Sequence, residues 1–247
     1  MNPLLRPLAG GLIVSCQAAP GSPMDQPDIL AAFAMAAQQA GAVAIRANHG
    51  PNIAAVSLAV DLPVIGIRKR EVEGFEVYIT PEWRDVEEVN GAGARIIALD
   101  ATDRARPGPE DFAALTERIH AELGALVVAD ISTYEEGMAA AEAGADIVAT
   151  TMSGYTPHTV GLLEIPGPDL VLVDRLAAAL GSHRAGENGG VPVICEGRVH
   201  TPAHARAALD AGAYAVVAGT AITAPTWIAG QFVQAMKDRW PSRIQPG

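Results

Sequence analysis

The sequence predicts one α/β domain over residues 1–247, a single closed (β/α)8 TIM barrel in which eight parallel strands alternate with eight helices. Three observations support this fold class. The length of 247 residues is typical of such barrels. The tripeptide Ala-Gly-Ala occurs four times, and eight short apolar runs alternate with stretches of helical composition. We expect residues 1–9 and 241–247 to be terminal tails.

The four Ala-Gly-Ala tripeptides mark junctions between a helix and the next strand. In each copy the glycine can adopt the left-handed conformation that ends a helix, so the chain turns directly into a strand. The tripeptides stand at residues 40–42, 92–94, 143–145 and 211–213. They precede the apolar runs Val43–Ile45, Ile96–Leu99, Ile147–Ala149 and Ala215–Ala218.

Four more apolar runs lie between these copies and complete a set of eight predicted strands. They are Gly11–Cys16, Pro63–Ile67, Leu126–Ala129 and Pro192–Cys195. All are nearly continuous in apolar character, as expected of parallel strands that are covered on both faces.

The intervening segments have helical composition, and several open with Pro or a capping residue, as in Thr201-Pro202. A doubly wound open sheet is the competing fold, but the repeat and the absence of a Gly-rich dinucleotide fingerprint weigh against it. Gly181–Gly190 reads as an exposed loop away from the functional face. The predicted helices lie near residues 28–40, 50–59, 81–91, 109–123, 134–143, 168–180, 202–211 and 225–239.

Composition excludes several classes of partner. The formal net charge of −11 and a pI near 4.9 argue against binding to nucleic acid or to an anionic membrane surface. Cys16 and Cys195 lie inside apolar runs and not at the spacing of a disulfide framework or a metal cluster. The first residues lack the features of an export signal, and no apolar run is long enough to span a bilayer. We therefore expect a cytoplasmic protein.

Every predicted strand ends in polar residues, which in this fold lie around the mouth where active sites form. Lys69 follows the third strand and Glu196 follows the seventh, half the circumference apart. The two side chains are therefore expected to approach a bound molecule from opposite sides. Inversion of a carbon next to a carbonyl requires this arrangement when one group removes a proton and another returns one to the other face.

Both groups need shifted pKa values for such chemistry. We expect partial burial and the neighbouring Arg68 and Arg70 to lower the pKa of Lys69, and desolvation to raise that of Glu196. From the sequence alone, an equally good interpretation is that Lys69 and Glu196 merely pair with opposite charges at the rim.

A phosphate site is predicted after the last two strands, from Gly197 and Arg198 and from Gly219 and Thr220. Barrels frequently bind phosphate there through backbone N–H groups and a short helix. These glycines also fit a purely structural role in turning the chain.

No metal site is predicted. His200 and His204 are four residues apart, but the start of a surface helix explains them better than a metal site does. Asp100 and Asp103 either bind substrate or cap the next turn. In the second case the adjacent Arg104 simply neutralises their charge.

The strand ends as a set resemble the N-acetylmannosamine-6-phosphate 2-epimerase family, whose members interconvert that sugar phosphate and N-acetylglucosamine 6-phosphate. The matching stretches are Gly10–Gln17, Ala44–Asn48, Leu62–Arg70, Tyr78–Pro81, Ala98–Arg104, Ala129–Thr133 and Glu196–Arg198.

The resemblance implies that Lys69 and Glu196 are the acid/base pair, that Gln17, Arg46 and Asp130 hold the sugar or its N-acetyl group, and that no redox cofactor is needed. Thr151, at the end of the sixth strand, and Tyr155, as a lid or packing aromatic, complete the expected substrate contacts. One departure is visible: the family commonly has arginine in the stretch after strand eight where this chain has Ala224. The loss removes a cation that is expected to bind the phosphate, so Arg198 and backbone amides are expected to contribute more of the phosphate binding.

Two other functions fit the same residues. In the second interpretation, Lys69 is the Schiff-base nucleophile of a sugar-phosphate aldolase or lyase. A catalytically inactive sugar-phosphate binding protein is the third possibility, supported by Ala224. The apolar segment Trp227–Val233 either seals the barrel or contacts a partner subunit, and we expect a homo-oligomer, with a dimer favoured.

Overall fold

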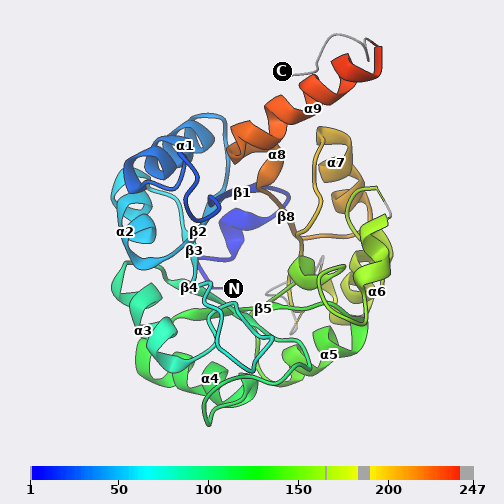
Figure 1. Ribbon diagram of the computed structural model, residues 1–247. Coiled ribbons are helices and arrows are strands. Elements are labelled where there is room, and N and C mark those ends of the chain that lie inside the picture. The colour runs from blue at the N-terminus through cyan, green and yellow to red at the C-terminus, as the bar shows by residue number, and fades with distance from the viewer. Residues whose placement is uncertain (1, 165, 183–189, 240–247) are drawn as a thin grey trace.

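The eight apolar runs form eight strands, each paired in parallel with the next, and β8 pairs with β1 to close the barrel (Figure 1). The computed structural model describes residues 2–164, 166–182 and 190–239. The predicted fold class is confirmed. The strands are β1 (Leu12–Cys16), β2 (Ala44–Asn48), β3 (Val64–Ile67), β4 (Ile96–Asp100), β5 (Leu126–Asp130), β6 (Ile147–Ala149), β7 (Val193–Cys195) and β8 (Ala215–Ala218).

Helices follow the strands and ring the barrel (Figure 1). Thr201 caps α7, as the sequence suggests, and Thr133 caps α5: its hydroxyl accepts from the backbone N–H of Glu136 in a capping box. The helices are α1 (Pro27–Gln39), α2 (Gly50–Ala59), α3 (Trp83–Gly91), α4 (Phe112–Arg118), α5 (Tyr134–Glu142), α6 (Leu170–Leu180), α7 (Pro202–Asp210), α8 (Thr220–Thr223) and α9 (Pro225–Arg239). Shorter helical turns are η1 (Arg6–Leu8), η2 (Ile119–Leu123), η3 (Thr150–Met152) and η4 (Val160–Glu164).

The Ala-Gly-Ala junctions behave as predicted. Gly41, Gly93, Gly144 and Gly212 have φ values between 92° and 107°, and each directly follows the residue that caps the preceding helix. A side chain is strained at such φ values, so glycine lets four helices end abruptly before a strand.

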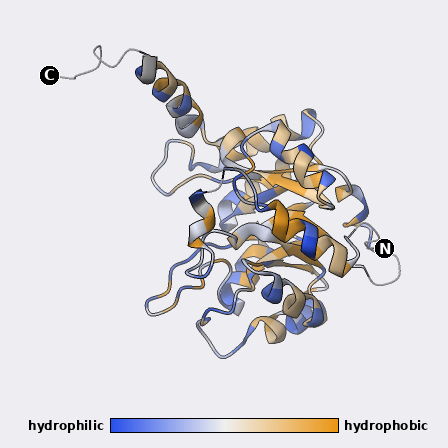
Figure 2. Cartoon of the chain, turned by 90° about the vertical axis from the view of Figure 1, so that its right-hand side faces the viewer, coloured by the Kyte–Doolittle hydropathy of each residue, from blue (hydrophilic) through white to orange (hydrophobic). Residues whose placement is uncertain are grey.

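Alternate residues of the strands build two layers of core. One layer fills the barrel interior and includes Ile13, Ile65, Ile96 and Val128. The residues that face outward, such as Val14 and Ile97, pack under the helices. Figure 2 shows strong apolar colouring on the strands, and hydrophilic colouring on parts of the outer helices and on loops. This rigid scaffold fixes the strand ends that carry the polar residues.

Part of the expected N-terminal tail, residues 1–9, packs against the barrel. Leu5 and Leu8 are buried with the interior layer, and Tyr214 donates a hydrogen bond to the carbonyl oxygen of Leu5 at 3.2 Å. They cover the bottom of the barrel, opposite the mouth. Residues 183–189 of the expected Gly181–Gly190 loop and the expected tail at 241–247 lie outside the described residues.

Helix α9 leads away from the barrel (Figures 1 and 2). Residues 231–237 are all exposed, so this part of α9 does not seal the barrel. The described helices include none that is both long and apolar enough to cross a membrane.

Candidate active site

A cavity of about 1690 Å³ opens at the carboxyl ends of the strands. Of the eleven site residues that the sequence predicts, ten line this cavity, and Asp130 contacts two of them from beneath. The lining residues are Gln17, Arg46, Lys69, Thr151, Tyr155, Glu196, Gly197, Arg198, Gly219 and Thr220. The strand ends therefore meet as the fold class requires.

A buried ionic network forms the floor of the cavity. Arg46 on β2 donates to both carboxylate oxygens of Asp130 on β5, at 3.0 and 2.5 Å, and to Glu196 Oε2 at 2.9 Å. Thr151 Oγ1 donates to Asp130 at 2.5 Å. Desolvation opposes the charge of Arg46, but the two carboxylates outweigh it and hold the pKa of Arg46 above its ordinary value. The guanidinium therefore remains a permanent cation at the base of the site.

Glu196 stands directly after β7, and its backbone is fixed on both sides by one side chain. Thr150 Oγ1 accepts from the Glu196 amide at 3.1 Å and donates to the Glu196 carbonyl oxygen at 3.0 Å. Desolvation raises the pKa of the Glu196 carboxyl, as predicted, and the charge of Asp130 adds to the effect. Arg46 and Lys69 act in the opposite direction without cancelling it.

Lys69 follows β3, across the barrel from Glu196. Its backbone N–H donates to Asn48 Oδ1 at 2.8 Å, and Lys69 pairs with Ile79 where the chain folds back on itself. Throughout the described ranges 2–164, 166–182 and 190–239, the Lys69 ammonium has neither a hydrogen-bond nor a direct ion-pair partner. Glu196 pairs with Arg46, so the two residues do not simply neutralise each other at the rim.

The pKa of Lys69 is lowered, as expected, but only one of the two expected causes contributes: desolvation does, and the charges of Arg68 and Arg70 do not. Water reaches the residue through the open mouth, yet the cavity walls desolvate its ammonium, and the Arg46 charge adds to the effect. The sequence neighbours Arg68 and Arg70 were expected to contribute. Instead Arg68 pairs with Glu88 at 3.0 Å, and Arg70 pairs with Asp85 at 2.7 Å and also with Glu82. Carboxylates on and beside α3 thus neutralise both arginines.

The opposite end of the cavity has the features expected of an anion site. Arg198 donates to two backbone carbonyl oxygens, those of Gly167 at 2.8 Å and Ser153 at 2.6 Å. Neutral acceptors orient this guanidinium without cancelling its charge. Gly219 precedes the short helix α8, and a Cβ at Gly219 would lie 3.1 Å from the Cβ of Ser15. Ala224, where the family commonly has arginine, also lines this end.

Two further predicted contact residues lie on the cavity wall. Gln17 donates from Nε2 to Ser15 Oγ at 2.8 Å, while its buried Oε1 has no partner among the residues the structure describes. Tyr155 is exposed at the edge of the cavity, a place that suits a lid.

The structure distinguishes the residues whose roles the sequence left open. Asp100 is fully buried and pairs with Arg104 at 2.7 Å, outside the cavity lining, so it is structural. His200 lines the cavity with its ring centroid 4.8 Å from that of Trp227, and its backbone N–H donates to His204 Nδ1. Within the described ranges, no cluster of three or more His, Cys, Asp or Glu side chains has the arrangement of a metal site.

The sequence reasoning missed one wall of the cavity. It consists of the loop after β1, from Ala18 to Asp25, together with His49, Pro51 and Asn52 at the start of α2. A loop whose polar residues follow no periodic pattern gives little signal in a single sequence. The positive φ of His49, 78°, is likewise invisible without the structure.

Comparisons with known proteins identify the family. Residues 30–238 match the family model NanE, "putative N-acetylmannosamine-6-phosphate epimerase". A protein of Caldanaerobacter subterraneus subsp. tengcongensis, named "putative N-acetylmannosamine-6-phosphate 2-epimerase", is 45% identical over 98% of both chains. A protein of the same name from Shigella dysenteriae is 48% identical over 92% of both. The solved N-acetylmannosamine-6-phosphate 2-epimerase of Clostridium perfringens superposes with a TM-score of 0.85, at 42% identity over 94% of this chain and 95% of that one. The chain therefore belongs to the NanE family of N-acetylmannosamine-6-phosphate epimerases.

Proposed function

We propose that this chain interconverts N-acetylmannosamine 6-phosphate and N-acetylglucosamine 6-phosphate by removing and returning the proton at C2. The observation that carries the proposal is Lys69, which lies at the mouth across from Glu196, has a lowered pKa and has no ammonium partner among the residues that the structure describes. The family membership and the 45–48% identity to the relatives above support the same reaction. It is a redox-neutral isomerisation that requires no redox cofactor.

The chemistry begins with the open-chain form of the sugar, because its C1 aldehyde acidifies the proton on C2. Neutral Lys69 takes this proton through Nζ, and the electron pair of the C2–H bond forms the C1–C2 double bond while the aldehyde oxygen becomes an enolate. A lowered pKa increases the fraction of Lys69 that is neutral and able to act as a base.

Glu196 returns a proton to C2 from the opposite face, and the enolate collapses to the epimeric aldehyde. A raised pKa keeps more of the carboxyl group protonated at a given pH, as an acid in this position requires. Arg46 and Asp130 hold Glu196 in place through the network on the cavity floor. In the reverse reaction the two groups exchange roles.

The proposed substrate contacts lie at the phosphate end, on the floor and on the wall of the cavity. Arg198, the backbone of Gly197 and Gly219, and Thr220 bind the phosphate after β7 and β8. Arg46 with Asp130 contacts the sugar from the floor, and the remaining wall contacts come from Gln17, Thr151 and Tyr155.

The test is NMR of each hexosamine 6-phosphate in deuterated water with the purified protein. Both sugars are expected to reach the same equilibrium mixture and to lose the C2 proton signal. A folded protein that neither interconverts the two sugars nor exchanges the C2 proton would contradict the proposal.

The proposal also covers the assembly and location of the protein. A homodimer in which α9 packs against the partner subunit is supported by three large apolar side chains on this helix: Phe232 is 69% exposed, Val233 48% and Met236 70%. One folded domain and a cytoplasmic location fit the closed barrel and the two buried free cysteines, Cys16 and Cys195.

A further inference from the structure

Glu196 stands where the pairing of its strand with both neighbouring strands has just ended. The register of β7 runs to Ile194 toward β6 and to Cys195 toward β8. Directly after Glu196 the chain turns away, because Gly197 and Arg198 have φ values of 104° and 56°. The proposed acid therefore lies between the end of a sheet ladder and a turn, so the contacts that fix its backbone come from outside the regular pairing of β7.

The Thr150 hydroxyl supplies these contacts. Thr150 Oγ1 accepts from the Glu196 amide N–H at 3.1 Å and donates to the Glu196 carbonyl oxygen at 3.0 Å. A hydroxyl can do both at once, because it has one hydrogen to donate and lone pairs with which to accept. Thr150 is fully buried, so bulk water does not compete for the two bonds. One buried atom thus fixes the backbone from which the Glu196 carboxyl group extends.

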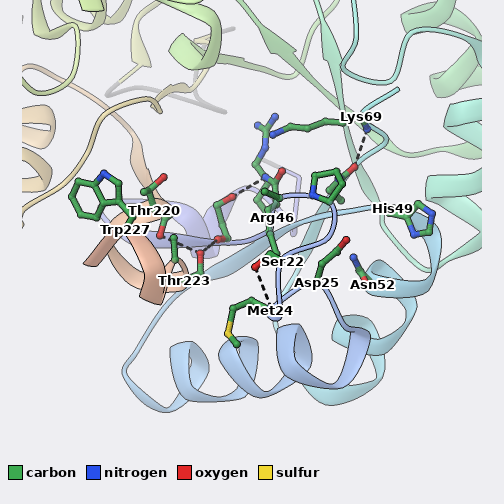
Figure 3. Close-up of a pocket in the computed structure, with 18 of the residues that line it drawn as sticks. Ser22, Met24, Asp25, Arg46, His49, Asn52, Lys69, Thr220, Thr223 and Trp227 are labelled. Carbon is green, nitrogen blue, oxygen red and sulfur yellow. Dashed lines mark hydrogen bonds between the residues drawn. The ribbon is translucent and has the colours of Figure 1, made fainter. Parts of the chain in front are cut away.

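The Glu196 side chain is held at its other end by Arg46, which donates to Oε2 at 2.9 Å. Figure 3 shows the side chain of Lys69 extending across the cavity toward Arg46, so the proposed base and the proposed acid act in the same part of the cavity. Loss of the Thr150 hydroxyl would leave the carboxylate paired with Arg46 but would release the backbone behind it. A misplacement of about 1 Å can slow an enzymatic step about 100-fold, so this second anchor bears on the reaction rate.

The cation of the proposed phosphate site is held by the same turn, but through the backbone. Arg198 donates to the carbonyl oxygen of Ser153 at 2.6 Å, and the Ser153 N–H donates to the carbonyl oxygen of Thr150 at 3.1 Å. Neither of these bonds uses the Thr150 side chain. Removal of its hydroxyl is therefore expected to disturb Glu196 and to spare Arg198.

We infer that Thr150 is a positioning residue for the proton transfer at C2: its hydroxyl fixes the backbone of Glu196 so that the carboxyl group reaches the face of C2 opposite Lys69. The inference rests on the proposed epimerase function and adds to it the group that keeps the acid in place. Thr150 acts through Glu196 and not on the sugar, because its buried hydroxyl is bonded to the Glu196 backbone.

This role predicts a defined fault when the hydroxyl is removed. Lys69 still takes the proton from C2, and the electron pair of the C2–H bond still forms the C1–C2 double bond of the enolate. Proton return from Glu196 becomes slow, so the protonated amine of Lys69 gives a hydrogen back to the same face and regenerates the starting sugar. In deuterated water most hydrogens on that amine come from solvent. The starting sugar therefore gains deuterium at C2 without epimerisation.

The experiment compares Thr150→Val, which lacks the hydroxyl, with Thr150→Ser, which keeps it. Each protein is incubated with N-acetylmannosamine 6-phosphate in deuterated water. At low conversion, mass spectrometry measures deuterium in the recovered starting sugar and NMR measures the epimer. In Thr150→Val, kcat for epimerisation should fall about 100-fold with little change in KM, and the ratio of exchange to epimerisation should rise about tenfold or more. Thr150→Ser should return both quantities toward the wild-type values.

Thr116→Val is the matched control. Thr116 is also a buried threonine, and its hydroxyl donates to the carbonyl oxygen of Phe112 at 2.8 Å within α4. Its replacement removes a buried hydroxyl of the same kind on the outer ring of helices, so the ratio of exchange to epimerisation should stay at the wild-type value.

A wild-type ratio in Thr150→Val, with both rates reduced equally, would overturn the inference, because the hydroxyl would then support the site as a whole. An unchanged kcat would overturn it too, as would a Thr150→Ser protein as impaired as Thr150→Val. If Thr150→Val does not fold, Thr150→Ala is measured in the same way; failure of both to fold, with Thr116→Val folded, would make Thr150 a structural residue and refute its positioning role. A wild type that neither epimerises the sugar nor exchanges its C2 proton refutes the proposed function itself, which keeps the two failures distinguishable.

Discussion

Replacing Asp130 by Asn tests the network on the cavity floor through both stability and pH dependence. Asp130 is fully buried and receives two hydrogen bonds from Arg46 and one from Thr151. Removing one partner of a buried ion pair typically costs about 3–5 kcal/mol, because a desolvated charge is left without compensation. Arg46 keeps its bond to Glu196 in the variant, so we expect a loss of about 3 kcal/mol, at the lower end of that range. For a chain of this size the melting temperature should fall by about 6–12 °C.

The same substitution should move the pH profile of kcat/KM in a defined direction. The Asp130 carboxylate raises the pKa of both Glu196 and Lys69, so its removal lowers both values. Both limbs of the bell-shaped profile should therefore shift to lower pH in Asp130→Asn. The measurements are thermal unfolding and initial rates of epimerisation across the pH range.

Asp100→Asn is the matched control for this variant. Asp100 ends β4 in register with Asp130 and is equally buried, but its carboxylate pairs with Arg104 and Thr102 and not with Arg46 or Thr151. It should lose stability without displacing the pH profile. An Asp130→Asn protein that is as stable as the wild type, or whose profile shifts to higher pH, would refute the reasoning, as would an equal shift in the control.

Three further predictions concern the base, the phosphate and the dimer. Lys69→Ala should abolish turnover while circular dichroism and the melting temperature stay near wild type, because the ammonium has no partner within the described part of the chain; a marked loss of folding would show that Lys69 is structural. Ala224→Arg should lower KM for the sugar phosphates without a similar change in kcat, because it adds a cation at the phosphate end; an unchanged KM would place the phosphate elsewhere. Phe232→Asp should convert a dimer to monomers in analytical ultracentrifugation, and a wild type that is itself monomeric would remove the proposed role of α9.

Local signals explain how much of the fold the sequence predicts. Each strand is a short apolar run, and each Ala-Gly-Ala junction needs only one glycine with positive φ, so both features are visible in a few adjacent residues. The path of α9 is different. The apolar residues of this helix fit either its own barrel or a partner, and nothing local to the segment distinguishes the two.

The candidate site divides in the same way. Its members could be named because each follows an identifiable strand, and the fold class places all strand ends at one mouth. Their pairing could not be deduced, since Arg46 meets Asp130 and Glu196 across 84 and 150 residues of sequence. The cause assigned to the Lys69 pKa was partly wrong for this reason: adjacent Arg68 and Arg70 seemed decisive, while carboxylates on and beside α3 neutralise them. Asn52 was missed because a helical asparagine carries no distinctive pattern.

The central claim is that two groups on opposite faces, Lys69 and Glu196, transfer the proton at C2. The most direct test starts from N-acetylmannosamine 6-phosphate deuterated at C2, in ordinary water, and analyses the product by mass spectrometry while little substrate has reacted. Two-face transfer predicts product whose C2 hydrogen comes entirely from solvent, because the deuteron removed by Lys69 is not the proton that Glu196 returns. Substrate deuterium retained at C2 of the epimer would contradict the account and assign both steps to a single base.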